Sequence, residues 1–519
     1  MSWEKEVEEL RRRGELAHRM GGPEKVARQH AGGKLTVRER VDRLLDAGSF
    51  HEIGGLTGVA RYHEGGALDG DLADFTPANL IFGRGRINGR PVAVTGDDFT
   101  VRGGANDGGI KHKLLAVERM ACDLRLPLVR LVDGTGGGGS VKNLELQGHS
   151  PMPKAFLWDW WTENLSEVPV VSLALGSVAG LGAARVVASH YSVMVKDSSQ
   201  MFVAGPPVVE WTHGKFEKNE LGGSHIHTRN GAVDDEAASE DDAFVRARKF
   251  LSYLPNSVYE LAARAPCDDD PARADPWLIE AVPREARKVY NMRRIIAAVA
   301  DRDSFFETGK LWGRSVITGF ARLGGWPVAL MAGDPMHYGG AWTARASEKV
   351  TRFVDLAQAF HLPVVHLVDV PGFLIGPQAE QEGTIRYGMR AAAAILQSTV
   401  PWCSVIVRKV FGVAGALHQN SSRYCMRLAW PSAEWGSLPI AGGLEAAYKA
   451  EIAAAPDPAA KRAEIEERIR KFASPLRGAE RYDIEEIIDP RDTRRLLCEF
   501  AELAAPVRTP GRSRFGVRP

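Results

Sequence analysis

Cysteine is scarce in this 519-residue chain, and its spacing suggests no covalent framework. The five cysteines are Cys122, Cys267, Cys403, Cys425 and Cys498, an odd number with no Cys-x-x-Cys pair. A disulfide scaffold needs paired cysteines, and a structural zinc site needs closely spaced thiolate or imidazole ligands. The sequence therefore favours neither, and we expect no metal site.

An excess of charge is also lacking, because 66 Lys and Arg residues balance 65 Asp and Glu residues. Without a one-signed field, no nucleic acid or anionic membrane is expected as a partner. No apolar run approaches the roughly 20 residues that span a bilayer. Residues 1–20 are densely charged and lack the apolar core of a signal peptide. We expect a cytoplasmic or organelle-matrix protein with two large domains.

Catalytic side-chain signatures are missing as well. The chain has no Gly-x-Ser-x-Gly elbow, no His-Glu-x-x-His and no Walker A sequence. Histidines that can serve as bases occur in segments 149–153, 223–231 and 418–422. A structural interpretation of these as loop or interface histidines is favoured over a catalytic one.

What the sequence does contain is an internal duplication. Residues 91–136 and 327–372 align without a gap and are identical at 16 of 46 positions. Upstream, DAGSFHE (46–52) matches DRDSFFE (301–307) at an offset of 255 instead of 236, and a Gly/Asp-rich insertion at 62–80, expected to be a loop, accounts for the difference. A period above 200 residues indicates duplicated whole domains.

The expected elements within each copy are strand–helix–strand units. Residues 107–125 are expected to form a helix and 128–132 a strand, and such crossovers join parallel strands, so the fold class is α/β. Thr36 and Glu39 form a capping-box pattern that predicts a helix start, with Gly48 placed to end that helix. The Pro/Asp-rich segment 264–285 is read as a linker between two tandem domains.

Glycines follow apolar strands at matching points of the two copies. The strand 169–175 leads into a Gly-rich turn and a helix, and aligning Pro169 with Pro401 puts Gly180 on Gly412. A helix N-terminus exposes backbone N–H groups without intrahelical partners, and two of them directed at one carbonyl form an oxyanion hole. The alternative, that these glycines only allow tight helix–sheet packing, stays open. Asp133 and Asp369, which end the strands before them, are expected to cap turns.

Taken together, several segments resemble the carboxyltransferase (β) subunits of biotin-dependent acyl-CoA carboxylases, of the propionyl-CoA and methylcrotonyl-CoA carboxylase type. In the first half they are GKLTVRERVDRLLDAGSF (33–50), FGRGRINGRPVAVTGDDFTVRGG (82–104), VMVKDSSQMFVAGPPVV (193–209) and ELGGSHIHTRNGAVD (220–234). In the second they are ASEKVTRFVDLAQAFHLPVVHLVDVPGF (346–373), AWPSAE (429–434) and FASPLRGAERYDIEEIIDPRDTR (472–494). The resemblance covers nearly the whole chain.

The resemblance implies two tandem crotonase-like domains (the ClpP/crotonase superfamily) and a homo-hexamer. Residues 1–264 are then the domain that binds acyl-CoA, and residues 285–519 the domain that meets carboxybiotin. The carried-over oxyanion donors are Gly180 and Leu181 in the first half and Val413 and Ala414 in the second. The carried-over substrate-binding residues are Gly136, Gly137, Gly138, Gly182, Gly415 and Ala416.

The chain also departs from the family's pattern. Leu181 stands where relatives have a small residue, and it is expected to narrow the approach to the first hole. Ala416 replaces an aspartate associated with propionyl-CoA, and residues 136–139 form a tetraglycine, so no particular acyl group is predicted.

The resemblance further implies a division of cofactors among partners. The chain has no biotinylation site and no ATP-grasp half, so biotin is expected on a partner carrier, ATP is used only by a partner biotin carboxylase, and coenzyme A enters as part of the substrate. Alternative hypotheses are the carboxyltransferase subunit of an acyl-CoA decarboxylase, a biotin-free crotonase-type enzyme, and a non-catalytic scaffold paralogue.

Overall fold

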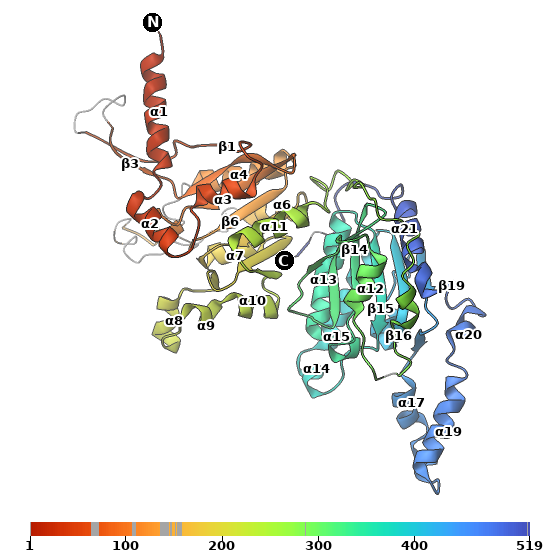
Figure 1. Cartoon of the computed structure of the whole chain (residues 1–519). Helices are drawn as coiled ribbons and strands as arrows, with labels where there is room; N and C mark the ends of the chain where they lie inside the picture. The colour runs from red at the N-terminus through yellow and green to blue at the C-terminus, as the bar shows by residue number, and fades with distance from the viewer. Residues whose placement is uncertain are drawn as a thin grey trace. The chain divides into compact units, whose positions relative to one another are not determined.

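The computed structural model describes residues 2–63, 72–105, 111–134, 158–285, 287–515 and 517–518, with positions 145, 148–150 and 152 besides. The chain divides into two compact units, Met1–Glu260 with Gly516–Pro519, and Leu261–Phe515 (Figure 1). The segment 264–285, predicted as a linker, belongs to the second unit. It includes the 3-10 helix η2, Pro276–Glu280, whose Leu278 is buried in that unit's hydrophobic core.

The first unit is built on a mixed sheet in which the central strands are parallel. Its strand order is β1 (His51–Glu52), β4 (Leu80–Ile87), β5 (Arg90–Asp97), β6 (Leu128–Val132), β7 (Val170–Ala174), β9 (Tyr191–Val195) and β11 (Asp235–Ala237). The pairs β1–β4 and β4–β5 are antiparallel, and the pairs from β5 to β11 are parallel. Every residue of β6 and β7 is buried, as expected of central strands covered on both faces.

Helices of the first unit largely follow the sequence pattern. They are α1 (Glu4–His18), α2 (Pro23–Ala31), α3 (Val37–Leu44), α4 (Lys111–Asp123), α6 (Trp158–Asn164), α7 (Leu181–Val187), α8 (Pro206–His213), α9 (Lys218–Gly222), α10 (Ser224–Asn230) and α11 (Glu240–Leu251). The capping box of α3 is confirmed, since the Thr36 side chain accepts from the Glu39 N–H and the Glu39 side chain accepts from the Thr36 N–H. This helix ends at Leu44, before Gly48.

The insertion expected to be a loop contains a strand. Residues Gly58–Tyr62 (β2) pair antiparallel with Leu72–Pro77 (β3), while residues 64–71 lie outside the described ranges. The prediction of a loop across 62–80 is therefore wrong for β3. Alternation of Phe75 and Pro77 with exposed polar residues gives the burial pattern of a solvated ribbon.

The second unit repeats this plan. Its sheet runs β12 (Phe306–Thr308), β13 (Val316–Leu323), β14 (Trp326–Gly333), β15 (Val364–Val370), β16 (Trp402–Phe411), β17 (Cys425–Ala429) and β19 (Glu486–Ile487), and β18 (Glu434–Gly436) pairs with the end of β16. The first three strands are antiparallel and the rest parallel.

The helices of the second unit are α12 (Met292–Val299), α13 (Ala344–Ala359), α14 (Pro377–Gln381), α15 (Thr384–Gln397), α16 (Gly412–Ala416), α17 (Ile440–Ala447), α18 (Lys449–Ala453), α19 (Pro458–Arg470), α20 (Pro475–Ala479) and α21 (Thr493–Ala504). Within this unit, α17 and α19 project away from the sheet (Figure 1). Within the described ranges, no helix combines the length and apolar character that crossing a bilayer requires.

The duplication extends to backbone conformations that L-residues seldom adopt. Arg125 (φ 53°) and His361 (φ 57°) are 236 residues apart, and Gly54 (φ 66°) and Gly309 (φ 65°) are 255 apart. Because a positive φ is costly for a residue with a Cβ, its recurrence at Arg125 and His361 indicates a shared backbone path, and the two glycines repeat the same φ at the other offset. The two sequence offsets are thus reproduced in three dimensions.

Candidate active site

The candidate site is a strand–glycine–helix turn that occurs once in each unit. In the first, β7 steps through Leu175 and Gly176 into β8 (Ser177–Ala179), which pairs in parallel with β10 (Gln200–Phe202). In the second, the last three residues of β16, 409–411, pair in parallel with β18. Gly180 or Gly412 follows immediately, and a short helix begins. In both units, therefore, a short parallel strand pair leads through a glycine into a short helix.

Glycine is required at the two corner positions. Gly180 has φ 56° and ψ −115°, and Gly412 has φ 60°. A side chain at these angles would be strained, and the absence of a Cβ leaves the backbone beside them open. Both glycines are exposed. The equivalence of Gly180 and Gly412 drawn from the alignment of Pro169 with Pro401 is reproduced by the structure.

The amide of Gly180 is engaged within the fold. Its N–H donates to the carbonyl of Phe202 at 3.1 Å, extending the β8–β10 ladder by one bond. In this conformation Gly180 therefore shapes the turn instead of offering a donor. The first-turn amides of α7 belong to Leu181 and Gly182, and helix geometry gives them no acceptor four residues earlier in the helix.

Leu181 does not stand over the turn as a simple obstruction. It is half-buried and packs against a cluster formed by Leu80, Leu114 and Trp161. The Leu181 side chain therefore lies partly in the interior and partly at the surface. Gly182 is buried beneath it.

In the second unit the site residues differ sharply in exposure. Val413 is 54% exposed and Ala416 is exposed, whereas Ala414 is 1% exposed and Gly415 is buried. A Cβ at Gly415 would lie 2.8 Å from the carbonyl carbon of Val410, so this glycine allows close packing of α16 on β16. Gly415 therefore follows the packing interpretation. Gly136, Gly137 and Gly138 lie outside the described residues.

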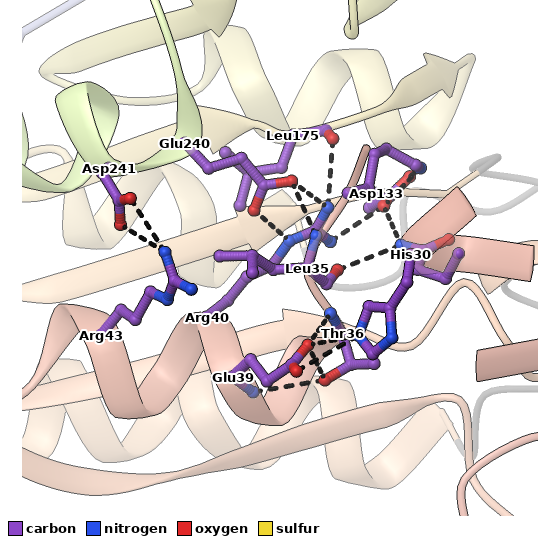
Figure 2. Close-up of polar contacts among 12 residues, drawn as sticks. His30, Leu35, Thr36, Glu39, Arg40, Arg43, Asp133, Leu175, Glu240 and Asp241 are labelled. Carbon is purple, nitrogen blue, oxygen red and sulfur yellow. Dashed lines mark hydrogen bonds and ion pairs between the residues drawn. The ribbon is translucent and has the colours of Figure 1, made fainter. Parts of the chain in front are cut away.

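Asp133, at the carboxyl end of β6, sits in a buried ion network (Figure 2). Its Oδ2 lies 2.8 Å from Lys34 Nζ and 2.8 Å from Arg40 Nη1, and Arg40 Nε lies 2.7 Å from Glu240 Oε2. Arg40 also donates to the carbonyl of Leu175 at 3.1 Å. Burial alone would raise the pKa of Asp133, but Arg40 and Lys34 hold it below its usual value. The network ties the ends of β6 and β7 together behind the first turn.

Asp369, the equivalent residue on β15, has different partners. Its Oδ2 accepts from the Tyr290 hydroxyl at 2.8 Å, and its Oδ1 accepts from the Lys409 N–H at 3.2 Å. Burial raises the pKa of Asp369 to about 6. The expectation that Asp369 caps its own turn is wrong, because its side chain instead accepts from Tyr290 and Lys409, whereas the turn after Asp133 continues into residues outside the described ranges.

Two of the histidines singled out as possible bases, the buried His418 and the half-buried His227, each have a ring nitrogen within hydrogen-bond distance of a backbone carbonyl. His418 Nδ1 lies 2.8 Å from the Gly415 carbonyl, and His227 Nε2 lies 2.8 Å from the Met201 carbonyl. His225 is exposed. Across the part of the chain that the structure describes, no three His, Cys, Asp or Glu side chains come together in a way that could hold a metal ion.

Sequence reasoning missed Arg40, Lys34, Glu240 and Tyr290. A signal for Arg40 was present, since it shares the apolar face of α3 with Val37, Val41 and Leu44. An arginine at a buried helical position must find acidic partners, because an unpaired charge there is very costly. Nothing comparable marks Tyr290, which lies in an irregular segment before α12.

Comparison with known proteins gives a consistent family. The carboxyl transferase domain matches residues 28–513. The propionyl-CoA carboxylase carboxyltransferase subunit of Haloferax mediterranei is 34% identical over 513 residues, covering 97% of each chain, and the methylmalonyl-CoA decarboxylase alpha subunit of Veillonella parvula is 32% identical over 479 residues, covering 91% of each.

A solved structure extends the agreement to the fold. Transcarboxylase 12S, determined as a hexamer with hydrolysed methylmalonyl-coenzyme A, superimposes with a TM-score of 0.85 at 30% identity, covering 99% of this chain and 98% of the other. The predicted fold class, two tandem crotonase-like α/β domains, is confirmed. The chain belongs to the carboxyl transferase family.

Proposed function

We propose that this chain transfers a carboxyl group from carboxybiotin, borne on a partner carrier, to the α-carbon of an acyl-CoA. The observation that carries the proposal is the pair of equivalent strand–glycine–helix turns, one in each unit, at Gly180 and Gly412. Both carboxyl donor and acceptor pass through enolate-like states, and each turn offers backbone amides to one such oxygen.

The residues at the turns suit a bulky ligand that carries an oxygen acceptor. Gly180 and Gly412 leave the backbone uncovered, and Leu181 and Val413 provide amides next to them. Carboxybiotin supplies the carboxyl group and, once CO2 has left it, a basic nitrogen for the α-proton of the acyl-CoA. This chain then needs no side-chain base: its amides stabilise the enolate oxygen, which favours loss of the α-proton and attack of the enolate carbon on CO2.

The division between the units is part of the proposal. We assign the acyl-CoA to the first unit, through Leu181 and Gly182, and the carboxybiotin to the second, through Val413 and Ala414. Biotin is carried by a partner, ATP is consumed only by a partner biotin carboxylase, and the chain works as a homo-hexamer. The carboxylase subunits among its relatives and the hexameric transcarboxylase 12S support this assignment.

A second candidate is the reverse direction, loss of the carboxyl group from a carboxylated acyl-CoA. The relative from Veillonella parvula, a methylmalonyl-CoA decarboxylase subunit at 32% identity, favours it. Both directions share the same enolate chemistry, so the same turns serve either.

A proline exchange tests the amides directly. Leu181→Pro removes one N–H at the first position of α7, where proline fits helix geometry, and Leu181→Ala keeps that N–H as a matched control. Val413→Pro and Val413→Ala form the corresponding pair in the second unit, at the second residue of α16, whose N–H also has no intrahelical acceptor. The assay follows carboxyl exchange between labelled methylmalonyl-CoA or malonyl-CoA and free biotin, with thermal unfolding to check each fold.

Each proline variant should lose on the order of 10²–10³-fold in kcat, as removal of one oxyanion donor does, while the alanine variants keep most of it. Equal effects of proline and alanine would reject the amide mechanism. A wild-type chain that exchanges no carboxyl group with any acyl-CoA, even with a cognate carrier and biotin carboxylase present, would leave a scaffold role instead.

A further inference from the structure

The carboxyl end of β15 faces an irregularity in β16. Val368 pairs with Ile406, but two residues later Val370 pairs with Val410, so β16 carries two additional residues at this point. Such a bulge interrupts the ladder and leaves backbone amides without their usual partners. The Lys409 N–H, within the bulge, donates to Asp369 Oδ1 at 3.2 Å. Asp369 thereby closes the irregularity with its side chain.

Lys409 is the first residue of the short segment that leads into the second turn. Residues 409–411 pair with β18 and lead directly into Gly412 and α16. The other oxygen of Asp369 accepts from the Tyr290 hydroxyl at 2.8 Å, and both side chains are buried. The Asp369 carboxylate therefore holds Lys409, the first of the three residues that precede α16.

In the first unit the equivalent aspartate, Asp133, has different partners. β6 and β7 pair in register up to Val132 and Ala174, as β15 and β16 do up to the equivalent Val368 and Ile406, so the units differ in the partners of the aspartate that follows. Asp133 is held by the cationic side chains of Lys34 and Arg40, which keep it ionised. In the second unit the neutral hydroxyl of Tyr290 takes the place of these cations, so the ionised form of Asp369 is stabilised less than that of Asp133.

The groups that face Asp369 decide its charge. Burial raises the pKa of Asp369 to about 6, while the hydrogen bond from Tyr290 and the positive charges of Lys409 and Arg408 lower it. Arg408 also lies 5.8 Å from the centre of the Tyr290 ring, and Asp334 adds a negative field at Tyr290. Asp369 therefore changes charge near pH 6, above the range of an ordinary aspartate.

We propose that Asp369 is a positioning residue whose ionised carboxylate, steadied by Tyr290, holds the bulge at Lys409 and thereby orients the amides of Val413 and Ala414 toward an enolate oxygen. This inference rests on the proposed function of that turn. Protonation of Asp369 weakens its acceptance of the Lys409 N–H, because a charged acceptor binds a donor about twice as strongly as a neutral one. The turn then loses its alignment.

The pH dependence of carboxyl exchange between methylmalonyl-CoA and free biotin tests the proposal. In the wild type, kcat falls on the acid side with a midpoint near 6. Tyr290→Phe removes a hydrogen bond that lowers the pKa of Asp369, so its acid midpoint should move upward by about one pH unit with little change in KM. Asp369→Asn should abolish this limb and lower kcat about tenfold or more at every pH.

Tyr191→Phe is the matched control. Tyr191 donates to Asp235 Oδ2 at the same 2.8 Å, from a buried position on β9 in the first unit. Loss of this bond should leave the acid limb of the profile at its wild-type midpoint. A Tyr290→Phe limb that coincides with the wild type, or a Tyr191→Phe limb that moves equally, would overturn the proposal.

Hydrogen exchange gives a readout that does not need activity. Peptides covering 409–414 should exchange faster in Asp369→Asn and Tyr290→Phe, and faster in the wild type below the midpoint than above it, after correction for intrinsic rates. Unchanged exchange in both variants would overturn the proposal. If no variant transfers a carboxyl group at any pH, the proposed function fails, and this exchange measurement alone decides the role of Asp369.

Discussion

Replacing Arg40 by methionine should destabilise the protein far more than replacing Arg43, three residues along the same helix. Both arginines reach α11, where Arg40 pairs with Glu240 at 2.7 Å and Arg43 pairs with Asp241 at 2.9 Å (Figure 2). The pairs share helix, partner helix and residue type. They differ in burial, and Arg40 also pairs with Asp133 and donates to the Leu175 carbonyl, so the two variants compare a buried ion network with an exposed ion pair.

The expected magnitudes follow from exposure. The side chains of Arg40 and Asp133 are 0% exposed and that of Glu240 is 8% exposed, so Arg40→Met strands two carboxylates in the interior. Breaking a buried pair in this way costs about 3–5 kcal/mol, and we expect the lower half of that range because Lys34 stays beside Asp133.

The control pair lies in water. The Arg43 and Asp241 side chains are 50% and 62% exposed. Exposed ion pairs contribute only about 0–1 kcal/mol, because solvent screens them and two long side chains must be ordered to form them. Arg43→Met should therefore be close to wild type.

Thermal unfolding of the two variants at pH 7.5, with hydrogen exchange of peptides from α3, measures this difference. The pH series adds a sign: Asp133 has a lowered pKa when folded, so it stabilises the fold above its unfolded pKa, and that stability is lost as pH falls through the folded value. Without Arg40 the folded pKa rises, so Asp133 contributes less stability and the loss is complete at a higher pH. Equal destabilisation by both variants would refute the reasoning that burial governs these pairs.

Three further outcomes are expected. Lys349→Met should cost about 3 kcal/mol or more in thermal unfolding, because its Nζ donates to three buried carbonyls, whereas Lys113→Met should cost nearer 1 kcal/mol, because one carbonyl accepts from it. Gly176→Ala should lower the melting temperature clearly, since its new methyl group would overlap the carboxylate of Asp133, and a wild-type melting curve would contradict the packing described. Asp369→Asn should stabilise the fold at pH 8 by about 1–3 kcal/mol and give no gain below pH 4, because the folded pKa of about 6 exceeds the ordinary 3.8; a gain that does not grow with pH would refute this.

Much of the fold was predictable because the chain carries two copies of one pattern. The offset of 236 residues that aligns Lys113 with Lys349, and the offset of 255 that aligns Gly54 with Gly309, meet in one contact: each lysine donates to the carbonyl of its glycine, at 2.9 Å and 2.8 Å. The lysines match at one offset and the glycines at the other, and the same lysine–glycine contact occurs in both units. Strand and turn positions followed from the same repetition.

The partners of the buried aspartates were not predictable in that way. Arg40 lies 93 residues before Asp133, and Tyr290 lies 79 residues before Asp369. Local periodicity reports which face of an element is buried, but it does not report which distant charge will be set against that face. The hydrogen bond from the Gly180 N–H to the Phe202 carbonyl was not predictable for the same reason, since it depends on the register of a short strand pair.

A comparison between the copies shows where the ionic contacts of the two units differ. In the second unit, Arg293 binds both Glu307 and Asp334 at 2.6 Å, which closes the cluster beside Lys349. In the first, the equivalent Arg38 binds Glu52 at 2.9 Å.

Asp98, the equivalent of Asp334, accepts from the backbone N–H of Thr100 at 2.9 Å, as Asp334 does from that of Met336 at 3.1 Å, but among the described residues Asp98 makes no ion pair with Arg38 like that of Asp334 with Arg293. The backbone around these residues is the same in both copies, and the ionic partners differ. Duplication preserved the backbone geometry of the two turns, while the charged partners of the aspartates behind each turn diverged. Asp133 and Asp369 follow the same rule, one fixed by cations and one left to titrate, so the charge behind each turn is the property by which we expect the two halves to differ in function.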